Sequence, residues 1–291
     1  MTAQTVAAAG AAPRRTSRAW GKFRRNRIAM AGAIIVLFFV VVAILAPLLS
    51  NHDPFQTSFS AIRKAPSARF WLGTDELGRD IYTRMLYGAR ASLMAGLASV
   101  VIAMAVGVPF GLLAGYFGGW IDSAISRVTE ALLAIPFLIL AIALAAFLGP
   151  SLMNAMIAIG VSAAPKFVRL ARGQVLAVKN EDYVQSARAL GATDGRIILR
   201  HILPNIMPPL IVQATITIAT AIIAEASLSF LGLGLQPPNP SWGSMLNTAK
   251  NFMTQAPWMS IFPGSAIFLA VLGFNLLGDG LRDALDPRQE K

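Results

Sequence analysis

The stretch VKNEDYVQSARALGATDGRIILRHILPN, residues 178–205, is a charged, amphipathic segment between two apolar runs. The chain around it has 291 residues, of which 55% are hydrophobic and 13% are charged. Soluble domains carry about 25% charged residues. This composition predicts a polytopic membrane protein, in which the amphipathic segment (residues 178–205) is too polar to cross the bilayer.

The composition also excludes several classes of site. The chain contains no cysteine, which rules out disulfide bonds, thiolate zinc sites and a thiol nucleophile. With only two histidines, His52 and His201, we expect no histidine metal site. The net charge of +11 favours contact with anionic lipid of the bilayer. A nucleic-acid-binding tail would need more stacking aromatics than Trp20 and Phe23, so no nucleic-acid partner is expected.

Six apolar runs are long enough to cross a bilayer core, which needs about 20 helical residues. They cover residues 28–49, 91–115, 131–148, 151–168, 206–231 and 259–277. The first run is too long for a signal peptide and no A-x-A cleavage site follows it, so we interpret it as an uncleaved signal anchor. The predicted fold is therefore an all-α polytopic membrane protein with six transmembrane helices.

The distribution of the 25 Lys and Arg residues predicts the orientation. Most of them lie in the N-terminal tail, at Arg127 in the second loop, between Lys166 and Arg200, and after the last span. The positive-inside rule makes this side the cytoplasm, so both termini are predicted to be cytoplasmic. The predicted divisions are a basic tail (1–27), the first span with an outer loop and interfacial helix (28–90), a core of five spans (91–281) and a C-terminal tail (282–291).

The two longer outer loops differ in character. In the first, apolar residues recur at helical spacing after Asp80, and Arg84 falls elsewhere on the helical wheel. This pattern predicts an amphipathic helix at the membrane interface, with a structural role favoured over ligand binding. The last outer loop, residues 232–258, is rich in Gly and Pro and fits either a lid or a rigid connector.

Three glycines of the second span, Gly107, Gly111 and Gly115, repeat at a spacing of four residues. Glycine faces allow the backbone of a neighbouring helix to approach closely in membranes. We therefore expect another helix to pack against this face.

Polar side chains form a stripe on the fifth span. Gln213, Thr217, Thr220 and Ser227 fall within about 80° of one another on a helical wheel. Lipid does not satisfy such groups, so the stripe faces either another helix or a translocation path, and both interpretations stay open. Glu225, the one acid deep in a span, lies off this stripe, and we expect it to be paired at a helix interface rather than to relay protons.

Two short helices are predicted within the amphipathic segment. Asn180 is a good N-cap for the first, and Gly191 is placed to end it with a positive φ. Thr193 is a good N-cap for the second, which Pro204 is expected to stop. The first helix has an apolar face formed by Tyr183, Val184, Ala187 and Leu190. Its small alanine and mixed charges favour docking into a protein partner over binding to lipid.

The string QSARALGATDGRIILRHILP resembles the EAA loop of bacterial ABC-transporter permeases, with its pattern E-A-A-x3-G-x9-I-x-L-P. The matching residues are Ala187, Gly191, Leu203 and Pro204. The departures are Gln185, Ser186 and His201. The strings LGTDELGRDIYTRMLYGARASL, GGWIDSAISRVTEALLAIP and EASLSFLGLGLQPPNPSWG resemble the C-type subunit of dipeptide/oligopeptide permeases. The likeness runs from about residue 24 to residue 287.

The resemblance implies a type I ABC importer permease fold, with a cytoplasmic coupling loop at about residues 169–205. It implies three kinds of partner: a second permease in a heterodimer, one or two ATPase subunits, and an extracytoplasmic peptide-binding protein. The implied ATPase-docking residues are Tyr183, Gln185, Ser186, Ala187, Arg188, Leu190, Gly191, Ala192, Leu203 and Pro204. Because Gln185 replaces a glutamate, we expect docking to depend mainly on Ala187, Leu190 and Gly191.

The chain has no G-x-x-x-x-G-K-[ST] motif, so ATP and Mg are expected on separate subunits and no cofactor on this chain. The leading hypothesis is a permease subunit of an ATP-driven importer of short peptides in a bacterial plasma membrane. Alternatives are an importer of another small solute, such as a nickel chelate, or an ion-coupled secondary transporter, which would need more intramembrane ions than Glu225. An intramembrane enzyme is not expected, because both histidines lie outside the spans.

Overall fold

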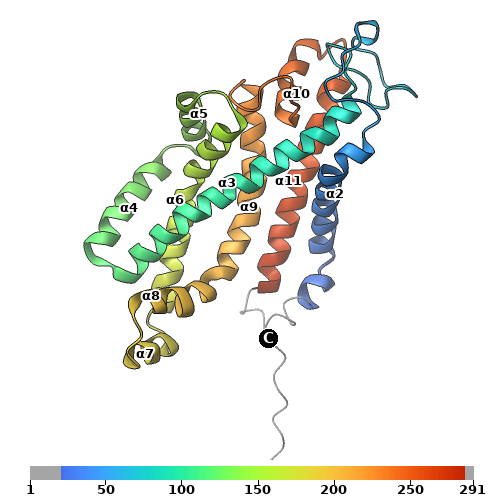
Figure 1. The fold of residues 1–291 in the computed structure, drawn as a ribbon. Coiled ribbons are helices and arrows are strands. Elements are labelled where there is room, and N and C mark those ends of the chain that lie inside the picture. Colours follow the sequence, from blue (N-terminus) through green and yellow to red (C-terminus); the bar gives the residue numbers. More distant parts are fainter. Residues whose placement is uncertain (1–20, 286–291) are drawn as a thin grey trace, which may run out of the picture.

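The computed structural model describes residues 21–285, which are largely helical and contain no strand (Figure 1). The long helices are α2 (Arg27–Leu49), α3 (Ile81–Phe117), α4 (Gly119–Ala134), α5 (Phe137–Leu148), α6 (Leu152–Val178), α9 (Leu203–Phe230) and α11 (Trp258–Leu285). The short helices are α7 (Asp182–Ala189), α8 (Asp194–Arg196) and α10 (Trp242–Ala249), and a π-helical turn covers Ile197–Ile202. Most of the two predicted tails, 1–27 and 282–291, falls outside the described residues.

Four helices are long and apolar enough to cross a membrane: α2, α3, α11 and the helix Asp194–Phe230, which runs from α8 through the π-helical turn into α9. Together, α4 and α5 would make a fifth span, but they are bent by 94° where they meet. The predicted all-helical membrane fold is therefore confirmed. The predicted count of six spans is not confirmed within residues 21–285.

The predicted third span, 131–148, is not one continuous helix, because the chain turns sharply between α4 and α5. Ile135 adopts an extended conformation (φ −85°, ψ 129°), which a following proline favours. Pro136 in turn has no N–H to donate to a continuing helix. The first arm of the bent pair begins at Gly119, so Arg127 lies within α4 and not in a loop.

The predicted fourth span ends at residue 168, whereas α6 continues to Val178. In the sequence, Lys166, Arg169 and Arg172 suggest the end of a membrane span. Neighbouring helices stabilise two of these charges. The Lys166 ammonium lies 4.8 Å from the centre of the Phe137 ring, and Arg172 forms an ion pair with Asp122.

The helix predicted after Asp80 is the first part of α3, which extends without a break over 37 residues, or about 55 Å. Its position at the membrane interface stays a prediction. Asp80 caps this helix, with its carboxylate accepting a hydrogen bond from the Thr83 N–H at 2.9 Å. Ile81 and Leu86 are buried, and so is Arg84. These side chains of α3 therefore pack inside the protein.

The glycines of α3 pack directly against α6, as the sequence predicts. A Cβ atom added at Gly107, Gly111 or Gly115 would lie 2.5–2.7 Å from an atom of α6, which is closer than real Cβ atoms approach their neighbours. The backbones of the two helices therefore lie very close together along three turns. We call this contact the glycine seam (Gly107, Gly111 and Gly115).

The last outer loop contains α10 and is a packed connector. Ser241 and Ser244 form a capping box at the start of α10, and the side chain of Trp242 is buried. The indole Nε1 donates a hydrogen bond to the Met85 carbonyl of α3 at 3.2 Å, and its ring lies 5.3 Å from that of Phe39 in α2. Through Trp242, α10 of this loop thus contacts both α2 and α3.

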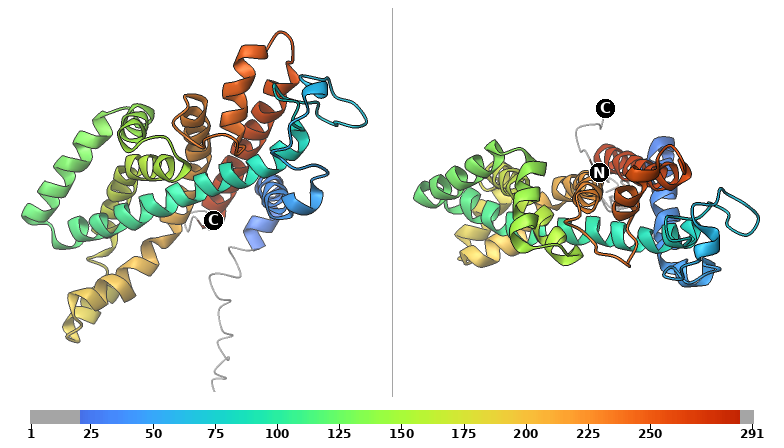
Figure 2. Two further views of the ribbon diagram at one scale, coloured as in Figure 1. Left: turned by 45° about the horizontal axis from the view of Figure 1, so that its top comes forward. Right: turned by 90° about the horizontal axis from the view of Figure 1, so that it is seen from above.

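The helices place the chain's features at two ends of the molecule (Figure 1). One end, which we call the loop end, holds α7, the start of α2 and the end of α11, where Asn26 donates a hydrogen bond to Asp283 at 3.3 Å. The opposite end, the cap end, holds α5, α10 and residues 50–80. Figure 2 shows that α3 runs obliquely across the other helices and connects the two ends.

The glycine seam predicts that Gly111→Ala destabilises the protein, because the added methyl group meets the backbone of α6. Overpacking of this kind costs about 1–3 kcal/mol. Gly173→Ala on α6 is the matched control, since its Cβ would have no atom within 4 Å and alanine favours helix by up to about 1 kcal/mol. Thermal unfolding of the purified variants in detergent measures both. Equal melting temperatures for the two variants would contradict the seam.

Candidate functional site

The two faces of α7 have different environments. Val184 and Ala187 are buried and belong to the same core cluster as Ile197 and Ile202 of the π-helical turn. Leu190, at the end of the helix, is 88% exposed. Ala187, which the sequence assigns to docking, therefore faces the chain's own core and fixes α7 to the protein.

The end of α7 is formed by Gly191, as the sequence predicts. Its φ is +77°, a conformation that glycine adopts without steric cost. The N–H of Gly191 donates to the Arg188 carbonyl at 3.0 Å, and the N–H of Ala192 donates to the Ala187 carbonyl at 3.1 Å. These two bonds form a Schellman-type end, which reverses the chain and leaves Leu190 at the tip.

Other predicted details of the amphipathic segment differ from the structure. The N-cap of α7 is Glu181 and not Asn180, and neither Glu181 nor Thr193, the N-cap of α8, makes a side-chain capping bond. Pro204 does not stop the second helix but lies in the first turn of α9. Proline is accommodated there at the junction where the wider bonding of the π-helical turn, in which the Leu203 N–H donates to the Ile198 carbonyl, passes into α-helix.

The amphipathic segment is held to the end of α3 by Tyr116, which the sequence analysis missed. The Tyr116 hydroxyl donates a hydrogen bond to the Asp194 carboxylate at 2.6 Å. The Arg188 guanidinium lies 5.9 Å from the centre of the Tyr116 ring and donates to its hydroxyl oxygen at 3.5 Å. Nearby, the Lys179 ammonium donates to the Gly115 carbonyl at 2.9 Å. Arg188, assigned to docking from the sequence, thus also contacts its own chain.

Besides Arg188, five of the residues assigned to docking are exposed together around α7. We call them the docking tip: Tyr183, Gln185, Ser186, Leu190 and Gly191. Exposed apolar side chains within a polar surface mark contacts with another molecule. The remaining assigned residues, Ala192, Leu203 and Pro204, lie in the following turn and at the start of α9.

The polar stripe on α9 is satisfied mainly by its own helix. Thr217 is buried and donates to the Gln213 carbonyl at 2.7 Å, while Thr220 donates to the Thr217 carbonyl at 2.9 Å. Ser227 donates to the Ile223 carbonyl at 2.8 Å. In the part of the chain that the structure describes, none of these hydroxyl groups bonds to another helix. A path-lining role for the stripe stays a prediction.

Glu225 is fully buried where α3, α9 and α10 meet. Its two carboxylate oxygens accept hydrogen bonds from Ser92 of α3 at 3.1 Å and from Ser229 of α9 at 2.7 Å. The backbone N–H of Trp242 donates in turn to the Ser92 hydroxyl at 3.4 Å. This is the pairing at a helix interface that the sequence predicts.

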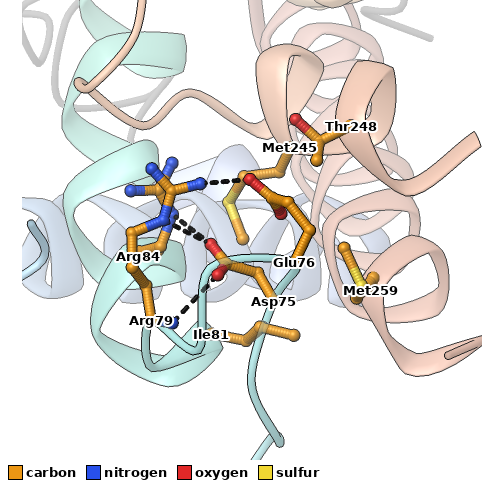
Figure 3. Close-up of a pocket in the computed structure, with 8 residues that line it drawn as sticks. All are labelled: Asp75, Glu76, Arg79, Ile81, Arg84, Met245, Thr248 and Met259. Carbon is orange, nitrogen blue, oxygen red and sulfur yellow. Dashed lines mark hydrogen bonds and ion pairs between the residues drawn. The ribbon is translucent and has the colours of Figure 1, made fainter. Parts of the chain in front are cut away.

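A buried ion-pair cluster lies at the cap end and was also missed (Figure 3). We call it the outer cluster: Asp75, Glu76, Arg79 and Arg84. The Arg79 guanidinium is 2.6 Å from the Asp75 carboxylate and 2.5 Å from the Glu76 carboxylate, and Arg84 is 3.4 Å from Asp75. Burial, with a further contribution from the neighbouring Asp75 carboxylate, raises the pKa of Glu76. In the sequence, the dense charge of the string TDELGRD, residues 74–80, was the signal that could have indicated this cluster.

Arg84 also joins loops that are far apart in sequence. Its Nη1 donates to the Pro54 carbonyl at 3.0 Å and to the Pro238 carbonyl at 3.3 Å. One guanidinium on α3 therefore holds the first and last outer loops together, which explains why Arg84 is buried and not on an exposed face of the helix.

The family model of the binding-protein-dependent transport system inner membrane component matches residues 107–291, more than half of the chain. The chain belongs to this family. A second model, the N-terminal TM domain of oligopeptide transport permease C, matches residues 15–66 of this permease.

Relatives of this permease align over nearly its whole length. The dipeptide transport system permease protein DppC of Alkalihalophilus pseudofirmus is 49% identical over 272 residues, covering 94% of this chain and 90% of that protein. The glutathione transport system permease protein GsiD is 47% identical in Pectobacterium atrosepticum (92% and 90% covered) and 48% identical in Escherichia coli (92% and 89% covered).

The permease also resembles a chain from an inward-facing structure of the MetNI methionine ABC transporter. The TM-score is 0.57 at 23% sequence identity, and the match covers 71% of this permease and 98% of that chain. At this identity the likeness is one of fold, and the fold is that of an ABC importer permease.

The outer cluster predicts that Arg84→Met destabilises the permease by about 3–5 kcal/mol, because it leaves buried acceptors without a partner. Arg90→Met is the matched control, since Arg90 is exposed on the same helix. Limited proteolysis of the outer loops reports the effect. Cleavage that is no faster in Arg84→Met than in Arg90→Met would refute the proposed role of the cluster.

Tyr116→Phe removes the hydrogen bond to Asp194 and should loosen the amphipathic segment without unfolding the helices. Hydrogen–deuterium exchange should become faster in residues 182–194 and stay unchanged in α9. Tyr87→Phe is the control, since the Tyr87 hydroxyl makes no hydrogen bond within residues 21–285. Unchanged exchange in residues 182–194 would show that Tyr116 does not hold the segment.

Proposed function

We propose that this permease is the membrane subunit of an ATP-driven importer of short peptides. The observation that carries the proposal is the 49% identity, over 94% of the chain, to a protein named as a dipeptide transport permease. The relatives named as glutathione permeases support the same cargo class, because glutathione is itself a short peptide. In this proposal the translocation path forms between the chain and a second, homologous permease.

The docking tip gives the proposal a mechanism of coupling. Leu190 and Tyr183 project from a short helix whose other face is fixed to the core by Val184 and Ala187. A groove of a cytoplasmic ATPase would receive these exposed residues, and closure of the ATPase pair would then move α7. Because Tyr116 and Lys179 hold the segment to α3, this movement passes to the long helix that reaches the cap end.

The proposal also specifies the sides of the membrane. The loop end, with both termini, faces the cytoplasm and its ATPases, which bind ATP and Mg. The cap end, with the outer cluster and α10, faces an extracytoplasmic peptide-binding protein. The distribution of Lys and Arg supports this orientation. ATP hydrolysis belongs to the partner chains, and this chain acts as a transport subunit in the bacterial plasma membrane.

The proposal is tested by introducing a charge at the docking tip. In cells that co-express the second permease and the ATPases, Leu190→Glu should abolish co-purification of the ATPases and uptake of a labelled dipeptide. The isolated permease should keep its stability, because Leu190 is 88% exposed. A buried charge without a partner in the interface would cost several kcal/mol.

Gly195→Glu is the matched control, because it adds the same charge to an open position of α8 in the same segment. It should leave assembly and uptake near wild-type levels. If Leu190→Glu assembles and transports as Gly195→Glu does, the docking tip is not the coupling surface.

A further inference from the structure

A groove of about 360 Å³ with a mixed polar and apolar lining lies between α4 and α6. We call it the inner groove; its polar lining residues are Ser126, Thr129 and Glu130 of α4, and Arg169 and Arg172 of α6. Apolar side chains complete its wall. Its volume lies within the range of about 300–1,000 Å³ that small-molecule sites occupy.

The charges in the inner groove are only partly paired. Arg172 is satisfied by Asp122, whose two carboxylate oxygens accept from its guanidinium at 2.5 Å and 2.7 Å. By contrast, Arg169 and Glu130 are exposed and make no hydrogen bond or ion pair within residues 21–285. A cation on α6 and an anion on α4 that form no ion pair with each other therefore line the same groove, and Glu130 also interacts electrostatically with Arg172.

The position of these charges along α6 makes contact with lipid unfavourable. Arg169 lies nine residues before Val178, or about 14 Å from the end of the helix. Lys166 lies one turn further in, with its ammonium against the Phe137 ring. Ionised side chains are costly in the hydrocarbon core of a bilayer, so such residues favour contact with water, a ligand or another protein. The inner groove thus holds charged side chains more than two turns before the end of α6.

We propose that the inner groove is a binding subsite for the charged ends of a zwitterionic peptide. Arg169 binds the peptide's carboxylate as a planar, two-pronged donor, and Glu130 binds its terminal ammonium. Ser126 and Thr129, whose hydroxyl groups donate to Asp122 and to the Ile125 carbonyl, also line the groove. This inference rests on the proposed function, since it places the cargo of a peptide importer within this chain.

The opposite charges on the two walls favour a zwitterionic occupant, such as a peptide, over an anionic one. An anionic lipid headgroup would be drawn to Arg169 but repelled by Glu130. A zwitterion with its charges at two ends satisfies both residues at once. An ion pair with a second permease would also satisfy them, and it is one of the outcomes of the test.

Photoaffinity labelling of the purified importer complex tests the subsite. The probe is a dipeptide with free termini that carries a diazirine on one side chain. We expect labelling within residues 126–134 or 165–172, reduced by excess Ala-Phe. The C-terminal amide of Ala-Phe should compete about tenfold less well, since it lacks the charge-assisted hydrogen bonds to Arg169.

The variant Arg169→Gln should remove this tenfold preference for the free carboxylate, while Glu130→Gln should remove the preference for Ala-Phe over its N-acetyl derivative. Arg127→Gln is the control, because Arg127 is an exposed residue of α4 that does not line the groove. The melting temperatures of the purified variants should match wild type, which separates loss of binding from misfolding.

Labelling outside the inner groove, or equal competition by free and amidated peptide in the wild type, overturns the subsite. Loss of the second permease on purification of Arg169→Gln also overturns it, because the groove would then be a subunit interface. Dipeptide uptake by wild-type proteoliposomes with the binding protein separates the two proposals. Normal uptake with no labelling refutes the subsite alone, whereas absence of all peptide uptake refutes the proposed function and the subsite with it.

Discussion

The close approach of α3 and α6 along the glycine seam determines how the rest of the permease is arranged. Because no side chain separates the two backbones, the end of α6 lies beside the end of α3, where Lys179 bonds to the Gly115 carbonyl. The amphipathic segment leaves α6 at this point and is bound again through Tyr116. At its other end, the same helix α3 carries Arg84, which joins the two outer loops. One helix thus contacts both candidate partner surfaces.

Much of the fold could be predicted because bilayer thickness and helix geometry limit the possibilities. Apolar length identified α2, most of α3, α9 and α11, and glycine spacing identified the seam. The errors arose where tertiary contacts outweighed local composition. The charges of α6 resemble the end of a span in sequence. In the structure, Phe137 of α5 stabilises Lys166, and Asp122 of α4 stabilises Arg172. The bend at Pro136 was readable from the chemistry of proline, whereas the angle of 94° was not.

For the candidate site, the sequence indicated the segment but not the direction of each side chain. Gly191 followed from helix-ending rules, whereas the sequence placed Leu190 on one apolar face with Val184 and Ala187. The burial of Ala187 and Val184 and the exposure of Leu190 depend on the π-helical turn, which no local sequence pattern predicts. Tyr116 and the outer cluster could not be assigned from spacing, because their partners lie far away along the chain. The inner groove likewise needs two helices side by side before Glu130 and Arg169 can be seen to share a space.

The central claim, that the exposed face of α7 contacts a cytoplasmic ATPase, can be measured directly with a cross-linker. The chain has no cysteine, so Ser186→Cys creates a unique attachment point for a benzophenone on the docking tip. Irradiation of native membranes that contain the assembled importer should yield a covalent product between the permease and an ATPase subunit. Cross-linking only to lipid, or to a protein on the outer side of the membrane, would contradict the account.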